Sequence, residues 1–428
     1  MTNNSPALLA IDGRMLICGP AALPLASPAL AQSRDGKTIG PYTELYDIDR
    51  TIVSLDAAYY GAMTRATHAH YRQNTNWVNR HYSVFLRSAL AGPTRDERLQ
   101  PTTDDVAKLI GASPAEVALC AGGTKALYGL IVNYTPLKPG DAIAMADVDY
   151  DEMQYAMEHL EATREVILKR IAIPEPSTTG NILEAYDRLF NETPQLKLLL
   201  LTHVSNRNGL IMPVAEIAKM AKSRGIDVIL DAAQSVGLLP VDVDSMGIDF
   251  MGFSLHKWVA APLGTGGVYI REERKNNIAP WLGNRIRNED DVRARVPTGT
   301  IDFAAKLTVP HALAQHHEIG PDRKLAYLRG LRDYWVERVR DIRGLKIVQP
   351  DDRDRYAAIG AFRLPGQTTI EQAREVQKRF LERHGVLVVP KAGLASGPVM
   401  RVTPALFNTP EDLNRLVSAI RAERSVFI

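Results

Sequence analysis

The sequence predicts an α/β fold built on a mostly parallel sheet, followed by a smaller α+β domain. Short, continuous apolar runs alternate with segments of helical periodicity, as in successive β-α-β units. Polar residues stand where several of these runs end, which is where parallel strands present binding and catalytic groups. From about residue 310 the pattern changes to helical segments separated by short strands, which indicates the second domain.

Apolar runs place the strands of the N-terminal segment and of the large domain. We expect strands at 52–55, 117–120, 142–146, 196–201, 226–230, 249–253 and 268–270. A crossover helix follows the fourth run, with Val214, Ile217, Ala218 and Ala221 on its buried face.

Residues 62–110 read as helical, and Thr103 is the predicted cap of the helix that ends before Gly111. Ser113 to Glu116 has the pattern of a capping box and predicts a short helix. In the second domain we expect strands near 344–348, 358–364 and 386–389, and a helix at 369–383. A last helix begins after Thr409.

Composition limits the function classes. A chain of 428 residues is long enough for two domains, and a net charge of +2 gives no electrostatic basis for binding nucleic acid or an anionic membrane. Two cysteines supply neither a disulfide framework nor a metal cluster. No apolar run has the length of a membrane span.

Asp231 and Lys257 are the residues around which the functional prediction is built. Each follows a buried apolar run, and the two runs are consecutive in the chain. Burial lowers the pKa of a lysine and makes its amine nucleophilic toward a carbonyl. A carboxylate beside a pyridine nitrogen keeps that nitrogen protonated, so that the ring accepts electrons. The pair therefore indicates a Schiff-base lysine and the ring partner of a pyridoxal cofactor.

The stretch from Leu230 to Ile270 resembles the pyridoxal-phosphate enzymes of aminotransferase class V, which include cysteine desulfurases, selenocysteine lyases and isopenicillin N epimerase-like proteins. The resemblance implies fold type I with a seven-stranded sheet, and pyridoxal 5'-phosphate held as an aldimine on Lys257 with Asp231 at its ring nitrogen. It also implies that Gln234 touches the ring hydroxyl and that Ser254 and His256 hold the phosphate.

Two further motifs match the cofactor site of that family. Glycines that leave a strand and enter a helix expose backbone N–H groups to an anion, and the match assigns the phosphate to Gly123 and Thr124. Tyr150 follows the strand at 142–146 and can stack on the pyridine face. Desulfurases carry histidine at that position and the epimerase-like branch carries tyrosine.

Three more residues match functional positions of that family. Asn206, in a His-Val-Ser-Asn run, is the expected partner of the ring hydroxyl or of the substrate. Arg401 matches the arginine that clamps the substrate α-carboxylate through its guanidinium fork. Thr300 matches a residue that reaches the phosphate of the partner subunit, which implies a homodimer with shared active sites.

The chain divides into four predicted segments. Residues 1–35 are an export signal or a disordered tail, because Ala29-Leu30-Ala31 has the form of a cleavage site. If residues 1–31 are a signal, the protein is periplasmic by a folded-protein export route; otherwise it is cytoplasmic. Residues 36–65 pack near the active site, residues 66–305 form the large cofactor-binding domain and residues 306–428 form the small domain.

The absence of a cysteine from one segment of the sequence narrows the range of reactions that the enzyme could catalyse. Residues 365–400 contain no cysteine, which argues against a desulfurase that relays sulfur through a mobile loop. The whole pattern, including Tyr150, favours an isopenicillin N epimerase-like enzyme acting on an amino-acid-type substrate. A lyase or an aminotransferase-type enzyme stays open, and the sequence names no second proton donor for epimerisation. A non-catalytic pyridoxal-phosphate-binding protein is disfavoured, because Lys257, Asp231 and Arg401 are all present.

Overall fold

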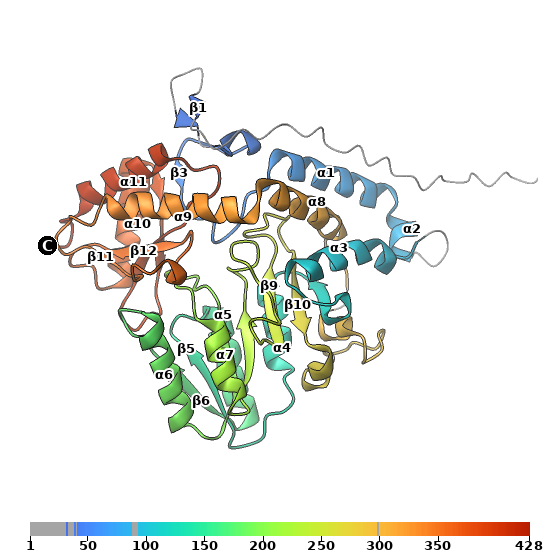
Figure 1. Ribbon diagram of the computed structural model, residues 1–428. Coiled ribbons are helices and arrows are strands. Elements are labelled where there is room, and N and C mark those ends of the chain that lie inside the picture. The colour runs from blue at the N-terminus through green and yellow to red at the C-terminus, as the bar shows by residue number, and fades with distance from the viewer. Residues whose placement is uncertain (1–30, 33–37, 40, 88–92, 298) are drawn as a thin grey trace, which may run out of the picture.

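The computed structural model describes residues 31–32, 38–39, 41–87, 93–297 and 299–428 (Figure 1). The predicted export segment lies outside these residues, apart from the strand β1 (Ala31–Gln32), which pairs with β2 (Thr38–Ile39). Among the described residues, none of the helices combines the length and the apolar character that crossing a membrane requires.

A seven-stranded sheet forms the centre of the large domain. Its strands lie in the order β4-β10-β9-β8-β7-β5-β6, and β10 alone runs antiparallel to its neighbours. Their bounds are β4 (Val117–Cys120), β5 (Ala142–Ala146), β6 (Ile167–Ile171), β7 (Leu196–Thr202), β8 (Asp227–Asp231), β9 (Phe250–Ser254) and β10 (Gly266–Ile270). The predicted mostly parallel seven-stranded sheet is therefore confirmed.

Both faces of this sheet are covered by helices, which is why its central strands are mostly apolar. On β5, Ala142, Ala144 and Ala146 pack into one core, while Ile143 and Met145 pack into the other. Helices α4 (Gly123–Val132) and α5 (Asp151–Arg164) supply the second core, and α6 (Thr179–Glu192) and α7 (Val214–Lys222) supply the first. This three-layer arrangement leaves the carboxyl ends of the parallel strands free to carry a site.

Further helices border the sheet. They are α1 (Arg65–Arg80), α2 (Tyr82–Arg87), α3 (Arg95–Leu109) and α8 (Phe303–Ile319), and α1 lies along α8 (Figure 1). The chain also forms short 3-10 helices at η1 (Thr43–Leu45), η2 (Pro114–Glu116), η3 (Glu272–Asn277), η4 (Val292–Arg295) and η5 (Arg353–Arg355).

The predicted cap of α3 is wrong. Thr94 caps this helix, because its hydroxyl accepts a hydrogen bond from the backbone of Glu97 and the Glu97 side chain reaches back to the Thr94 backbone. Thr103 lies inside the helix and its hydroxyl donates to the Leu99 carbonyl. By contrast, the capping box at Ser113 and Glu116 forms as predicted.

The small domain is a four-stranded antiparallel sheet in the order β11-β12-β15-β14, covered by helices. Its elements are β11 (Lys346–Ile347), β12 (Gly360–Arg363), β13 (Val386–Leu387), β14 (Val389–Lys391), β15 (Val399–Val402), α9 (Pro321–Glu337), α10 (Ile370–His384) and α11 (Pro410–Glu423). Its core includes Trp335 from α9, Phe380 from α10 and Leu416 from α11. The predicted α+β character of this region is confirmed.

The N-terminal segment connects the small domain to the large one. Strand β3 (Val53–Ser54) pairs in parallel with β13, and the Ala57 N–H donates to the Thr403 carbonyl at 3.1 Å. Four residues later the Gly61 N–H donates to the carbonyl of His256 at 3.0 Å. This segment therefore reaches the residues that precede Lys257.

Candidate active site

The sheet brings Asp231 and Lys257 to one edge. Asp231 is the last residue of β8 and pairs with Gly252 on β9, and Lys257 follows the end of β9 by three residues. Protein atoms surround the Lys257 amine closely, and this desolvation lowers its pKa to about 8. The nearby Asp231 carboxylate opposes part of the shift, so the two groups share one electrostatic environment.

A second buried carboxyl group, that of Asp149, lies close enough to Asp231 for the two charges to interact. Asp149 accepts hydrogen bonds from the backbone N–H of Ala146 at 2.7 Å and of Thr202 at 3.1 Å. Burial raises its pKa to about 7, and the negative charge of Asp231 adds to the shift. Asp149 thereby joins the carboxyl ends of β5 and β7 and fixes the backbone immediately before Tyr150.

The predicted phosphate cradle is the glycine turn that joins β4 to α4. The Gly123 N–H donates to the Ser254 hydroxyl at 3.0 Å. A methyl group on Gly123 would lie 2.8 Å from that hydroxyl oxygen and 3.1 Å from the Ala233 Cβ, and Gly122 has a φ of +103°. Glycine is required here because a Cβ on residue 123 would collide with Ser254 and Ala233, and because the positive φ at residue 122 is unfavourable for other residues.

His256 and Thr124 border the same cradle. A Cβ on Gly122 would lie 3.1 Å from His256 Cε1, and His256 Nδ1 is 2.9 Å from the Thr265 carbonyl oxygen. Burial lowers the pKa of His256, so the ring is neutral at neutral pH. Thr124 is half-buried in the first turn of α4. The predicted phosphate residues Gly123, Thr124, Ser254 and His256 thus come together.

Three predicted ring-contacting residues lie at neighbouring strand ends. Tyr150 is half-buried at the N-terminus of α5, and burial together with nearby carboxylates raises its pKa. Asn206, after β7, has a buried side-chain oxygen with no partner among the described residues. Gln234 is buried, and its amide donates to the Ala58 carbonyl at 2.8 Å and accepts from the Trp258 indole at 3.0 Å.

Arg401 reaches the site from β15 of the small domain. Its Nη1 donates to the Asn206 carbonyl at 2.8 Å, and its Nη2 forms an ion pair with Asp56. The Nε atom is buried without a partner among the described residues. A guanidinium held in this way, with one nitrogen unsatisfied, is suited to bind a carboxylate.

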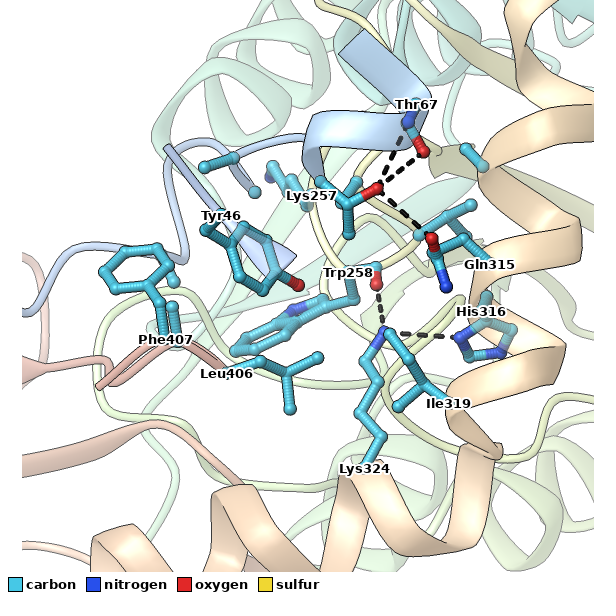
Figure 2. A pocket seen from close by; sticks show the side chains of 18 of the residues that line it. Tyr46, Thr67, Lys257, Trp258, Gln315, His316, Ile319, Lys324, Leu406 and Phe407 are labelled. Carbon is cyan, nitrogen blue, oxygen red and sulfur yellow. Dashed lines mark hydrogen bonds between the residues drawn. The ribbon is translucent and has the colours of Figure 1, made fainter. Parts of the chain in front are cut away.

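The turn that carries Lys257 is held by a hydrogen bond from Lys324 to the next residue, Trp258. Figure 2 shows a pocket beside this turn, in which the Lys324 amine lies between the Trp258 carbonyl and the His316 ring. Lys324 donates to that carbonyl, and its amine is 3.3 Å from His316 Nδ1. The pocket is lined by Lys257 but not by Asp231 or Tyr150, so it lies next to the strand-end site and is distinct from it.

Residues 63–416 match the model of the Aminotransferase class-V family. The chain belongs to this family. It is therefore a pyridoxal-phosphate-dependent enzyme of class V, which confirms the predicted family, cofactor and enzyme class.

Several relatives and solved structures place this class V enzyme among known proteins. It is 28% identical to isopenicillin N epimerase from Streptomyces clavuligerus, over 74% of this chain and 83% of the epimerase. It is 26% identical to a probable cysteine desulfurase from Mycolicibacterium paratuberculosis, over 94% of this chain and 58% of that protein. The structure of a cysteine desulfurase from Thermococcus onnurineus superimposes with a TM-score of 0.74 at 19% identity, covering 88% of this chain and 96% of that one.

The residues present in this class V enzyme fit pyridoxal phosphate. The glycine turn at the start of α4 brings backbone N–H groups next to the Ser254 hydroxyl and the His256 ring, and it is packed too tightly for a Cβ on Gly123. Asp231 is buried with a backbone partner on Oδ1 from Ala233 at 2.9 Å, and Asn206 keeps a buried oxygen without a partner. Lys257 follows His256, which borders the cradle, and its amine is influenced by the charge of Asp231.

Thr300 is the predicted residue that this single chain does not bring to the site. It is exposed in the loop before α8, and no described contact joins it to the other predicted residues. Its assignment to the partner subunit's site remains a prediction.

Sequence reasoning gave no role to Asp56, Asp149 and Lys324. Each acts through a partner that is distant in the chain, which no local motif reports. A signal was available for Asp149, because an acid directly before the stacking tyrosine occupies a buried strand end.

Proposed function

We propose that this enzyme acts at the α-carbon or side chain of an amino acid or an amino-acid-derived group, in the manner of isopenicillin N epimerase. One observation carries the proposal. Lys257 and Asp231 stand at the carboxyl ends of two adjacent parallel strands and influence each other's ionisation, with the Arg401 guanidinium reaching the same site. These three groups suit a cofactor aldehyde, a cofactor ring nitrogen and a substrate carboxylate.

Each residue contributes one physical task. Lys257 would hold the cofactor covalently, and its amine, when free, would accept or return the proton at the α-carbon. Asp231 keeps the ring nitrogen protonated, and Tyr150 covers the ring face. Gly123, Thr124, Ser254 and His256 hold the phosphate, while Asn206 and Gln234 lie near the ring hydroxyl.

The cofactor supplies an electron-accepting ring, and the protein decides which bond is broken. Arg401 would orient the substrate through its carboxylate, and this orientation would determine which bond at the α-carbon reacts. Lys257 would exchange a proton at one face of the α-carbon. A proton donor on the other face is what would distinguish an epimerase from a lyase or an aminotransferase.

A lyase without a relay thiol is the second candidate. The structure of a cystine C-S lyase, solved with cysteine persulfide, superimposes with a TM-score of 0.72 at 16% identity. Residues 365–400 contain no cysteine, and Cys120 is buried with a pKa raised to about 11 by that burial. A thiol in this state is a poor nucleophile, which disfavours a sulfur relay.

We also propose a homodimer in which Thr300 reaches the phosphate of the partner's site. The exposed position of Thr300 and its separation from this chain's own cradle support that arrangement. Sedimentation analysis of the purified protein, with Thr300→Ala tested for weakened cofactor retention, checks it.

The central test is the visible absorption of the purified enzyme. The wild type is expected to be yellow, and its band should shift when an amino acid substrate is added. Lys257→Ala should abolish the band, whereas Lys125→Ala, an exposed lysine beside the cradle, should keep it. Retention of the band by Lys257→Ala would show that the covalent assignment is wrong. Product analysis by mass and chirality across an amino-acid panel then separates the epimerase from the lyase.

A further inference from the structure

Lys391 lies on the same sheet face as Arg401. In the antiparallel pair of β14 and β15, Val389 stands opposite Arg401, and Lys391 is two residues further along β14. Residues two apart on a strand share a face, and a diagonal cross-strand neighbour is about 7–8 Å away. The backbone register therefore places a lysine beside the predicted carboxylate clamp.

The Lys391 ammonium faces the candidate active site. Arg401, Asp56, Asp151 and Arg207 all influence its ionisation, and its positive charge in turn influences Lys257. Burial and the Arg401 guanidinium lower its pKa to about 8, so it remains mostly charged at neutral pH. Its charge belongs to the same cluster as the groups assigned to cofactor and substrate.

The two arginines of this cluster already have partners. Arg401 pairs with Asp56, and Arg207 pairs with Asp151 at 2.7 Å while donating to the Asp149 carbonyl at 3.1 Å. Lys391 forms no hydrogen bond or ion pair with any residue in the described part of the chain. A half-buried ammonium without a partner loses hydration that nothing in the protein replaces.

The backbone around Lys391 is held in place. The next residue, Ala392, accepts a hydrogen bond on its carbonyl oxygen from Arg207. The Ala395 N–H donates to Asp147 Oδ2 at 2.8 Å. Gly393 has a φ of +97°, and a Cβ there would collide with the Arg207 guanidinium. These contacts fasten the end of β14 to the large domain, so the lysine is presented by a fixed backbone.

We propose that Lys391 is a specificity-determining residue, and that the site takes amino acids whose side chain carries a second anionic group. The inference rests on the function proposed above, because Arg401 must hold the α-carboxylate for Lys391 to meet the side chain. The separation of the two cations suits an acidic amino acid, whose two carboxylates are a few bonds apart.

The test uses the cofactor-loaded enzyme and two pairs of near-isosteric amino acids. Wild type, Lys391→Met and Lys346→Met are titrated with L-glutamate and L-glutamine, and with L-aspartate and L-asparagine, while the visible band is followed. Lys346 is exposed on β11 of the same sheet and serves as the matched control. Lys391→Glu is the charge-reversed variant, titrated also with L-lysine.

The wild type is expected to bind the charged member of at least one pair about tenfold more tightly, as a charge-assisted contact provides. Lys391→Met should lose that preference by weakening the charged member, Lys346→Met should keep it, and Lys391→Glu should favour L-lysine. No preference in the wild type, no response to any acidic amino acid, or an unchanged preference in Lys391→Met would overturn the inference. Absence of the visible band would instead contradict the proposed function.

Discussion

The Nη2 atom of Arg401 donates to the carboxylate of Asp56, although 345 residues separate them in the sequence. Arg401 is 3% exposed at its side chain and Asp56 is 25% exposed, so the pair lies at the boundary between the site and solvent. The guanidinium assigned to the substrate is thus partly neutralised before a substrate arrives. A substrate carboxylate must share Arg401 with Asp56 or displace it.

Asp56→Asn should therefore change stability and binding in opposite directions. Losing a charge-assisted hydrogen bond should cost about 1–3 kcal/mol of unfolding free energy. Carboxylate ligands should bind more tightly, because the Asp56 carboxylate no longer competes with them for Arg401. Urea unfolding and titration of the visible band measure the two effects. Asp47→Asn, which removes an exposed partner of Arg65, is the control and should alter neither. Unchanged or weaker ligand binding in Asp56→Asn would refute the competition.

The cradle prediction concerns Gly123. An alanine there would place a methyl group 2.8 Å from the Ser254 hydroxyl oxygen, so it would displace a side chain assigned to hold the phosphate. Gly123→Ala should reduce cofactor affinity by about tenfold or more while the protein still folds, since a lost anion contact of this kind is worth at least 1.4 kcal/mol. Gly180→Ala, in α6, meets no atom within 4 Å and should bind cofactor like the wild type. Equal retention of cofactor by both variants on dialysis would contradict the assignment.

Asp149→Asn tests the link between β5 and β7. The two carboxylate oxygens accept one backbone N–H each, from Ala146 and Thr202, whereas an amide offers one acceptor. One buried N–H should lose its partner, at a cost of about 1–3 kcal/mol in unfolding free energy. Chemical denaturation measures this cost. Asp187→Asn, on the exposed side of α6, is the comparison and should change stability little.

Local patterns were sufficient for most of the large domain. Strands such as Ala142–Ala146 were predictable because burial on both faces makes them uninterruptedly apolar. Strand β6 was not predicted, because Lys169 and Arg170 interrupt a run that lies at the sheet edge. Thr103 was mistaken for a cap because the true cap, Thr94, precedes a polar first turn in which the apolar stripe has not yet begun.

The site residues were predictable only where a charged or polar side chain directly follows a predicted strand. Asp231 and Lys257 follow apolar runs, so sequence order alone places them at one edge. The partnership of Asp56 with Arg401 depends on how the N-terminal segment crosses between domains. The position of Lys391 depends on the register of β14 against β15, which a sequence does not specify for strands this short.

Lys324 gives the last prediction, which concerns pH. Burial lowers its pKa to about 7 in the folded protein, well below the ordinary lysine value of 10.5. Between pH 7 and 10 the unfolded chain therefore holds a proton that the folded chain has released, so the free energy of unfolding rises with pH across this window. Lys324→Met should reduce that rise by up to about 1.4 kcal/mol per pH unit, the value for one proton.

The measurement is urea unfolding of wild type, Lys324→Met and Lys346→Met at several pH values from 7 to 10. Lys346 is exposed, so its replacement should leave the slope unchanged. Lys324→Met should also leave the Trp258 carbonyl without its side-chain donor, which loosens the turn behind Lys257. The variant is therefore expected to have a flatter pH profile together with weaker cofactor retention. An unaltered slope would mean that the Lys324 amine keeps its proton in the folded protein, paired with the Trp258 carbonyl and the His316 ring.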